Sequence, residues 1–181
     1  MKFSLVRQRD AMQCGIACLT MICRHFGSNV DISQVEQYCC AAKRGVSMLS
    51  LVRAAKILGL DSKPMRRTLD ELAQGPFPCI LHWNQNHFVV LYKVDRKGSR
   101  FWIADPGKGL MKYSMEDMRK HWTSVSYNGK ECGVVMFLDS TRDFNENLKG
   151  KTKEQKQIFH FLKRYIKQYH HHFGVIILCL V

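Results

Sequence analysis

The hydrophobic pattern of this 181-residue chain changes character near its middle, and this change limits the possible fold classes strongly. Up to residue 74, apolar residues recur at three- and four-residue spacing, which is typical of helices. From Pro78 onward, short apolar and aromatic runs are separated by Gly, Pro, Asp and Asn, which is typical of strands. Helices followed by strands predict an α+β fold whose strands pair antiparallel.

Capping residues and glycines set the expected limits of the helices in the first half. We expect a first helix at residues 15–26 and a second that is capped by Asp31 or Ser33 and runs to about Cys40. A third is expected at residues 47–58, and a short fourth helix follows the capping box Thr68-Leu69-Asp70-Glu71. The expected strands are residues 78–83, 87–92, 100–105 and 132–138, with one inserted helix that is capped by Ser114.

Composition restricts the class of protein further. Hydrophobic residues make up 46% of the chain, which supports a packed core and argues against disorder. The net charge of +13 suits nucleic acid, an anionic membrane surface or acidic ligands, and it does not choose among them. The chain starts without the apolar core of a signal peptide, so we interpret the eight cysteines as thiols of a reducing compartment. Their spacing does not fit a zinc site, and no metal is expected.

The last forty residues differ from the rest of the chain. Residues 141–172 are expected to form a basic connector that is partly helical, followed by the apolar run 173–181. This run is shorter than the roughly 20 residues that span a bilayer. We interpret it as the start of a truncated transmembrane helix, because a Lys/Arg-rich zone before an apolar run follows the positive-inside rule. A small packed strand or helix is the alternative. Residues 1–140 then form the globular domain.

The start of the first helix carries a candidate nucleophile. Gln8 lies six residues before Cys14, which opens the apolar helix. A thiol at a helix N-terminus lies in a positive field that favours the reactive thiolate. An amide just upstream can donate N–H groups to an oxyanion beside that thiol. Cys18 falls inside the apolar helix and is expected in the core, whereas Cys39 and Cys40 lack an upstream Gln at this offset.

Catalysis by a cysteine also requires an imidazole. His87 follows the polar loop 84–86 and begins a strongly apolar strand, which places an imidazole at the end of a rigid sheet. The alternative is a loop histidine that only caps a turn. His82 is the competitor, but it lies in the middle of a strand between two large apolar residues.

Asp105 is the candidate that orients this imidazole. It ends the strand 100–105 and precedes Pro106, so it can also be a turn-initiating aspartate. If this strand pairs with the strand that begins at His87, through the turn 95–98, then His87 and Asp105 meet at one end of the hairpin. The register of the hairpin therefore favours the catalytic interpretation.

Together these residues resemble the papain-like cysteine peptidase domain at the N-terminus of bacterial peptidase-containing ABC transporters, which export bacteriocins and peptide pheromones. The resemblance rests on Gln-x-Asp-x-x-x-Cys-Gly-x-Ala-x-Leu-x-Met from Gln8, on a His before an apolar strand, and on Asp-Pro-Gly at Asp105. It covers about residues 1–140 and implies a helical N-terminal half packed on an antiparallel β-sheet half. Residues 141–181 then correspond to the connector and the first transmembrane helix.

The resemblance also implies an activity. Such domains are endopeptidases that remove leader peptides from precursors after a double-glycine motif, and the rest of the transporter exports the product with ATP. By this resemblance, Cys14 attacks the scissile carbonyl and His87 shuttles the proton. Asp105 fixes the imidazole tautomer, and Gln8 holds the oxyanion together with the backbone N–H of Cys14.

Partners and location follow from the same resemblance. It implies no cofactor in this domain, and ATP and Mg in the full-length transporter. The expected partners are a precursor peptide with an amphipathic leader helix and the transmembrane and nucleotide-binding domains of the same chain, in a homodimeric transporter. The location is the cytoplasmic face of the bacterial cell membrane, with this fragment cytosolic.

Two other functions compete with the peptidase. A catalytically silent domain that docks the peptide would not need the intact Cys, His and Asp set. A nucleic-acid binder is suggested only by the net charge, part of which lies in the tail, and no nucleic-acid motif supports it. We therefore expect no nucleic-acid partner.

Overall fold

The computed structural model describes residues 3–39, 45–127, 129–142 and 144. The chain divides into two compact units, Met1–Phe144 and Asn145–Val181, and the description below concerns the first of them. The predicted membrane segment 173–181 and nearly all of the predicted connector 141–172 lie outside the described residues. Among the helices that are described, none has the length and apolar character needed to cross a membrane.

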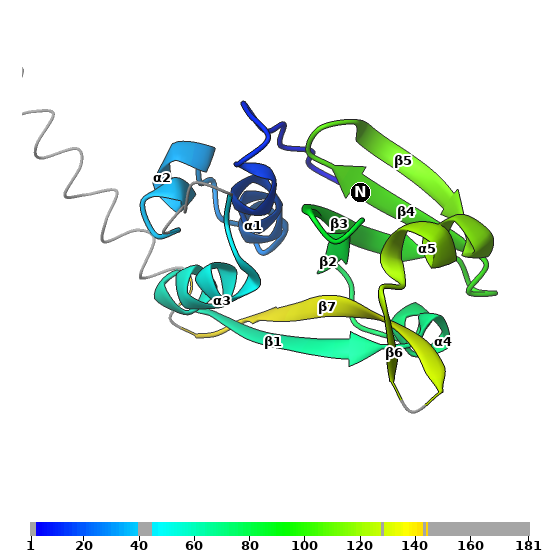
Figure 1. Ribbon diagram of the computed structural model, residues 1–181. Helices are drawn as coiled ribbons and strands as arrows, with labels where there is room; N and C mark the ends of the chain where they lie inside the picture. Colours follow the sequence, from blue (N-terminus) through cyan, green and yellow to red (C-terminus); the bar gives the residue numbers. More distant parts are fainter. Residues whose placement is uncertain (1–2, 40–44, 128, 143, 145–181) are drawn as a thin grey trace, which may run out of the picture. The chain divides into compact units, whose positions relative to one another are not determined.

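The described part of this unit contains five helices and seven strands (Figure 1). In chain order the described elements are α1 (Cys14–His25), α2 (Ile32–Glu36), α3 (Met48–Ile57), β1 (Leu60–Arg67), α4 (Leu69–Ala73), β2 (Cys79–Trp83), β3 (His87–Val94), β4 (Arg100–Asp105), β5 (Gly109–Ser114), α5 (Met115–Trp122), β6 (Val125–Tyr127) and β7 (Lys130–Ser140).

Most helix ends lie close to where the capping residues predicted them. The side chains of Ser47 and Thr68 accept the first-turn N–H groups of α3 and α4, and Ser114 does the same for α5. Gly27 follows α1 with a φ of +89°, which suits a glycine that ends a helix. The second helix is shorter than expected: α2 ends at Glu36 rather than near Cys40. After Glu36 the backbone hydrogen bonds span three residues rather than four. The N–H groups of Tyr38 and Cys39 donate to the carbonyls of Val35 and Glu36, which makes tighter turns than an α-helix.

Seven antiparallel strands form the sheet, which confirms the predicted α+β class. Their order is β1-β7-β2-β3-β4-β5, and β6 pairs with β7 outside this path. Strands β1, β5 and β6 were not expected from the sequence. The first half is mostly helical, as expected, but β1 lies in it between α3 and α4 and forms one edge of the sheet.

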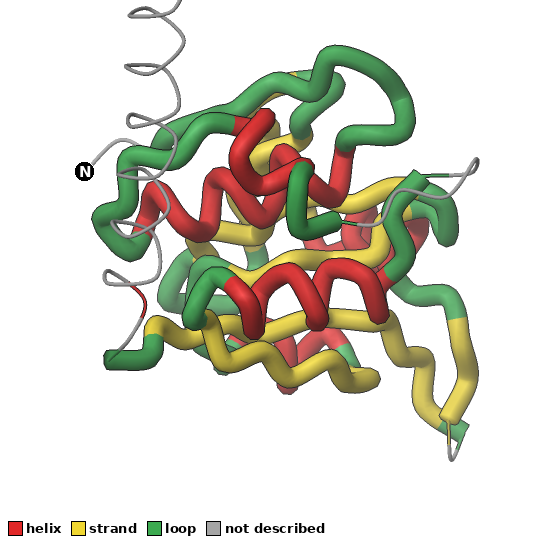
Figure 2. Tube along the Cα trace, turned by 90° about the vertical axis from the view of Figure 1, so that its left-hand side faces the viewer, coloured by secondary structure: helices red, strands yellow, loops and turns green. Residues whose placement is uncertain are grey.

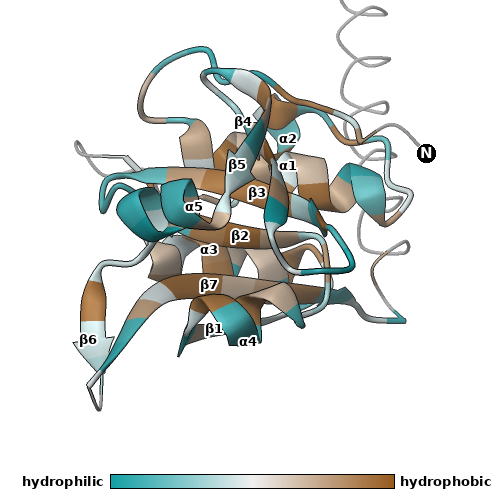
Figure 3. Cartoon of the chain, turned by 90° about the vertical axis from the view of Figure 1, so that its right-hand side faces the viewer, coloured by the Kyte–Doolittle hydropathy of each residue, from teal (hydrophilic) through white to brown (hydrophobic). Residues whose placement is uncertain are grey.

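Helices cover both faces of the sheet. On one face α1 packs on β3 and α3 packs on β1; Figure 2 views this side, with both helices in front of the strands. On the other face α4 and α5 enclose a core cluster that includes Leu72, Trp83, Phe101 and Trp122. Figure 3 views that side, where β2, β3 and β7 are hydrophobic and α5 is largely hydrophilic. The predicted packing of helices on a sheet is thus confirmed.

A β-bulge interrupts the β3–β4 hairpin at Tyr92. Leu91 pairs with Ile103, but Lys93 pairs with Trp102, so Tyr92 is an extra residue on β3. A shift of one residue moves side chains to the opposite face of a sheet. Beyond the bulge, Leu91 and Ile103 are paired and therefore lie on the same face of the sheet. Side chains alternate along each strand, so Asp105 lies on the same face as Ile103, and His87 on the same face as Leu91. The bulge therefore lets the chain place His87 and Asp105 on the same face.

Candidate active site

Cys14 is the first residue of α1, as the sequence predicted, and its side chain is only 5% exposed. The preceding residue, Gln13, makes no side-chain cap for the helix. Its amide instead donates to Glu36 at 2.9 Å and accepts the N–H of Arg9 at 3.3 Å. Gln13 therefore ties the start of α1 to α2 and to the N-terminal segment, which leaves the thiol of Cys14 at the open end of the helix.

Hydrogen bonds favour the thiolate form of Cys14. Burial alone raises the pKa of this thiol. Hydrogen bonds from the His87 side chain and from the backbone N–H groups of Phe88 and Gly15 outweigh burial, and together with the charge of His87 they lower the pKa. Gly15 also brings α1 close to β3, because a Cβ at this position would lie 3.2 Å from side-chain atoms of Leu51 and Phe88.

His87 and Asp105 form the second contact of the site. Nε2 of His87 lies 2.9 Å from Oδ1 of Asp105, so Nδ1 is the ring nitrogen left to face Cys14. Burial alone lowers the pKa of His87, but hydrogen bonds to Asp105 and Cys14 and the charges of both groups raise it to about 9. Near neutral pH His87 is thus an imidazolium, and it lies beside a thiol whose pKa is lowered.

Asp105 remains ionised although its side chain is only 2% exposed. The N–H groups of Gly107 and Lys108 donate to its Oδ1 at 2.8 and 3.2 Å. Burial raises the pKa of this carboxyl group, but the bonds from His87 and Gly107 outweigh burial and lower the pKa. A carboxylate held by backbone donors stabilises the imidazolium and fixes the orientation of the ring.

Gln8 lies beside the turn that follows Asp105. Its backbone N–H donates to the Pro106 carbonyl at 3.2 Å, and its side-chain carbon Cδ and nitrogen Nε2 are 3.8 Å from the position that a Cβ of Gly107 would occupy. Oε1 of Gln8 is buried and has no hydrogen-bond partner within the described part of the chain. The structure thus brings Gln8 to the same turn as the His87–Asp105 pair.

The other candidates lie apart from this arrangement. His82 packs against Phe88, with ring centroids 5.2 Å apart, and burial lowers its pKa. Cys18 is fully buried, and burial raises its pKa well above the ordinary value. All six cysteines among the described residues are free thiols, and no group of three potential metal ligands gathers in that part of the chain.

Sequence reasoning missed the backbone donors and the anchor of α1. The N–H of Phe88 reaches Cys14 only because β3 passes the start of the helix, and no residue type encodes that approach. The bond from Gln13 to Glu36 joins residues that are 23 positions apart. The polar Gln directly before Cys14 was the one available signal for it.

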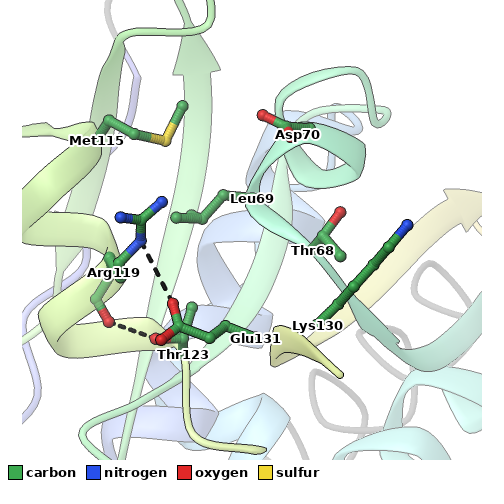
Figure 4. Close-up of a pocket in the computed structure, with 8 residues that line it drawn as sticks. All are labelled: Thr68, Leu69, Asp70, Met115, Arg119, Thr123, Lys130 and Glu131. Atoms are coloured by element: carbon green, nitrogen blue, oxygen red, sulfur yellow. Dashed lines mark hydrogen bonds and ion pairs between the residues drawn. The ribbon is translucent and has the colours of Figure 1, made fainter. Parts of the chain in front are cut away.

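A cavity of about 350 Å³ lies elsewhere, between α4, α5 and the β6–β7 hairpin (Figure 4). Leu69 and Met115 are its apolar members, and an ion pair of 3.4 Å joins Arg119 and Glu131 at its wall. None of its lining residues belongs to the site around Cys14. The reactive groups thus lie outside this cavity.

A helix that begins with a cysteine, set against a sheet that supplies a histidine and an aspartate, defines a papain-like cysteine peptidase. A model of the peptidase C39 family matches residues 2–128, and the chain belongs to this family. The chain is 37% identical over 122 residues to the colicin V secretion/processing ATP-binding protein CvaB of Escherichia coli. It is 34% identical over 128 residues to the lactococcin-G-processing and transport ATP-binding protein LagD of Lactococcus lactis.

These alignments cover 67% of this chain but only 17% and 18% of the two relatives, so the chain matches a small part of each. Solved structures resemble the fold. A double glycine motif protease from an AMS/PCAT transporter, in complex with the leader peptide, is 33% identical with a TM-score of 0.68, over 77% of this chain and 93% of that one. The peptidase domain of Streptococcus ComA is 26% identical with a TM-score of 0.66, over 77% of this chain and 100% of that one. The predicted peptidase fold is thereby confirmed.

Proposed function

We propose that this domain is an endopeptidase that cuts leader peptides from bacteriocin or pheromone precursors after a double-glycine motif. The observation that carries the proposal is the linked set of Cys14, His87 and Asp105, in which a thiol of lowered pKa faces an imidazolium. The similarity to a double glycine motif protease bound to a leader peptide supports this substrate class.

Each residue has a defined role in the proposed reaction. The Cys14 thiolate attacks the carbonyl carbon of the second glycine, and the His87 imidazolium protonates the leaving amine. The leader remains on sulfur as a thioester until a water molecule, deprotonated by His87, releases it as a free acid. Asp105 holds the imidazole in place, and Gln8 and the Cys14 N–H bind the oxyanion.

The rest of the assembly belongs to the same proposal. The cleavage needs no cofactor in this domain, whereas export by the transmembrane and nucleotide-binding domains of a longer chain uses ATP and Mg. The partner is the amphipathic leader helix of the precursor, and the complete transporter is a homodimer at the cytoplasmic face of the bacterial membrane. The names of the relatives, which combine processing with ATP binding, support this setting.

The test is cleavage of a synthetic double-glycine precursor. We expect Cys14→Ala to abolish cleavage and to keep the circular dichroism spectrum of the folded domain. The matched control is Cys132→Ser on β7, where the Cys132 thiol donates to the Lys130 carbonyl and a hydroxyl can do the same. This variant keeps its activity. A precursor that binds the unaltered domain but is never cut would favour the silent docking function instead.

A further inference from the structure

The N-terminal segment Phe3–Gln8 carries the proposed oxyanion donor but lies in no helix or strand. No ladder of hydrogen bonds therefore fixes where Gln8 lies. Its position depends on contacts at the two ends of the segment. In Figure 1 this dark blue segment runs beside the hairpin of β3 and β4.

Contacts at the Gln8 end reach the turn after β4. The N–H of Gln8 bonds to the Pro106 carbonyl, and the guanidinium of Arg7 lies 3.5 Å from the Gly107 carbonyl oxygen. The side chain of Val6 is buried. Just beyond Gln8, the Arg9 N–H donates to the Gln13 side chain at 3.3 Å. None of these contacts reaches the start of the segment at Phe3.

The other end is held by the bulge on β3. The ring of Phe3 stacks on the ring of Tyr92, with centroids 4.6 Å apart and planes 10° from parallel. Tyr92 is the residue that the bulge adds to the strand, whereas its neighbour Lys93 lies over the Trp102 ring. Tyr92, which has no paired residue on β4, thus supplies an aromatic ring at the bulge. Among the described residues, the ring that stacks on it is Phe3, at the start of the segment that ends at Gln8.

We infer that Tyr92 is a positioning residue: its stack with Phe3 stops the segment from pivoting and sets the Gln8 amide in place for the oxyanion. This inference rests on the proposed function. It assigns a role in turnover to a residue of β3 that touches neither Cys14 nor His87 in the described contacts. Displacing a catalytic group by about 1 Å costs up to about 100-fold in rate, so a loose anchor has a measurable effect.

The experiment is a double-mutant cycle between Tyr92 and Gln8, measured as kcat and KM on a double-glycine precursor. We expect Gln8→Ala to lower kcat by about 10²–10³-fold. Tyr92→Ala lowers kcat by about tenfold or more with little change in KM. In the Gln8→Ala background, Tyr92→Ala lowers kcat by less than about a further twofold, because the effect of Tyr92 on kcat depends on the Gln8 side chain. Tyr92→Phe retains the stack and the rate.

Three further measurements separate positioning from general stability. Phe3→Ala removes the other ring of the stack without altering the sheet, and it reproduces the loss caused by Tyr92→Ala. Tyr127→Ala is the matched control, because Tyr127 is 56% exposed on β6, and it changes nothing. Alkylation of Cys14 by iodoacetamide keeps its rate and pH dependence in every Tyr92 variant, since His87 and Asp105 are untouched.

Each contrary outcome has a distinct meaning. If Tyr92→Ala lowers kcat equally in the presence and absence of the Gln8 side chain, the inference is overturned and the proposed function stands. A changed alkylation profile in the Tyr92 variants has the same meaning. A full rate in Gln8→Ala removes both the oxyanion role and this inference, while Cys14, His87 and Asp105 keep their roles. An unaltered domain that cuts no double-glycine precursor overturns the proposed function and the inference together.

Discussion

Asp105 determines the electrostatics of the site through one oxygen atom. Its Oδ1 faces the His87 ring and also accepts two backbone N–H groups of the following turn. These donors keep the carboxylate ionised, and the ionised carboxylate raises the pKa of His87. The charged form of Cys14 depends in turn on that imidazolium. A turn motif thus controls the reactivity of a thiol on another element.

The pH dependence of activity tests this chain of effects. The thiolate–imidazolium pair is populated above the lowered pKa of Cys14 and is lost as pH rises through the His87 pKa of about 9. We expect Asp105→Asn to move the alkaline limb of kcat/KM to lower pH, because an amide no longer stabilises the imidazolium. Iodoacetamide alkylation across pH provides the second measurement.

Asp95→Asn is the matched control for this prediction. Asp95 lies at the opposite end of the same hairpin, where its carboxylate accepts bonds from Ser99 and Arg100. Its amide variant should keep the alkaline limb near pH 9. An alkaline limb that stays near 9 in Asp105→Asn would show that another group sets the pKa of His87.

Individual site residues differ in how far sequence alone could locate them. Cys14, His87 and Asp105 stand at element ends that caps and turns mark, and the hairpin predicted that His87 and Asp105 meet. The approach of Cys14 to His87 was implied only by the family resemblance. Tyr92 gave no such signal. A bulge arises from how two strands pair over a distance, and a tyrosine within an apolar run is equally compatible with a regular strand.

At the scale of elements, burial explains which strands the sequence revealed. Strands β2 and β3 are buried along most of their length and therefore read as continuous apolar runs. Strand β1 at one edge mixes buried or half-buried residues with exposed ones, most of which are charged. It also contains Pro64, which an edge strand tolerates. Strand β5 at the other edge is mostly exposed. Neither edge strand carries the apolar run that marks a central strand.

The contact of α5 with β7 depends on a glycine. A Cβ at Gly133 would lie 2.3 Å from the Trp122 indole, which also donates a hydrogen bond to the Val134 carbonyl at 3.0 Å. We expect Gly133→Ala to destabilise the domain by about 1–3 kcal/mol, because a fully buried ring must move. Urea unfolding followed by circular dichroism measures the loss.

The same substitution in a Trp122→Ala background supplies the control. Without the indole the added methyl group meets no ring, so the further cost of Gly133→Ala should fall, while the Trp122 backbone carbonyl, 2.7 Å from the added Cβ, still contributes. An undiminished cost in this background would show that the indole is not the cause.

At the scale of the whole molecule, the last strand of the described unit lies inside the sheet, next to strands from the middle of the chain. Strand β7 lies between β1 and β2 and pairs with both. The sequence predicted this strand and the α+β class, but pairing between residues about 75 positions apart follows from packing alone. The predicted domain limit at residue 140 stays a prediction.

Cutting the chain before or after β7 tests its importance. The family model ends at residue 128, before β7 begins. We expect a fragment of residues 1–128 to lose cooperative unfolding and cleavage, because β1 has no other partner and β2 loses one side. A fragment of residues 1–144 should keep both properties in urea unfolding and precursor cleavage. A cooperative and active 1–128 fragment would contradict this expectation.

The central place of β7 also has a consequence for biosynthesis. A ribosome makes Cys14, His87 and Asp105 before it makes Lys130–Ser140, yet the sheet that holds them cannot close until that strand has emerged. During this interval the edges of β1 and β2 are open to pairing with other chains. The nascent domain therefore carries its proposed nucleophile long before β7 leaves the exit tunnel and completes the fold around it.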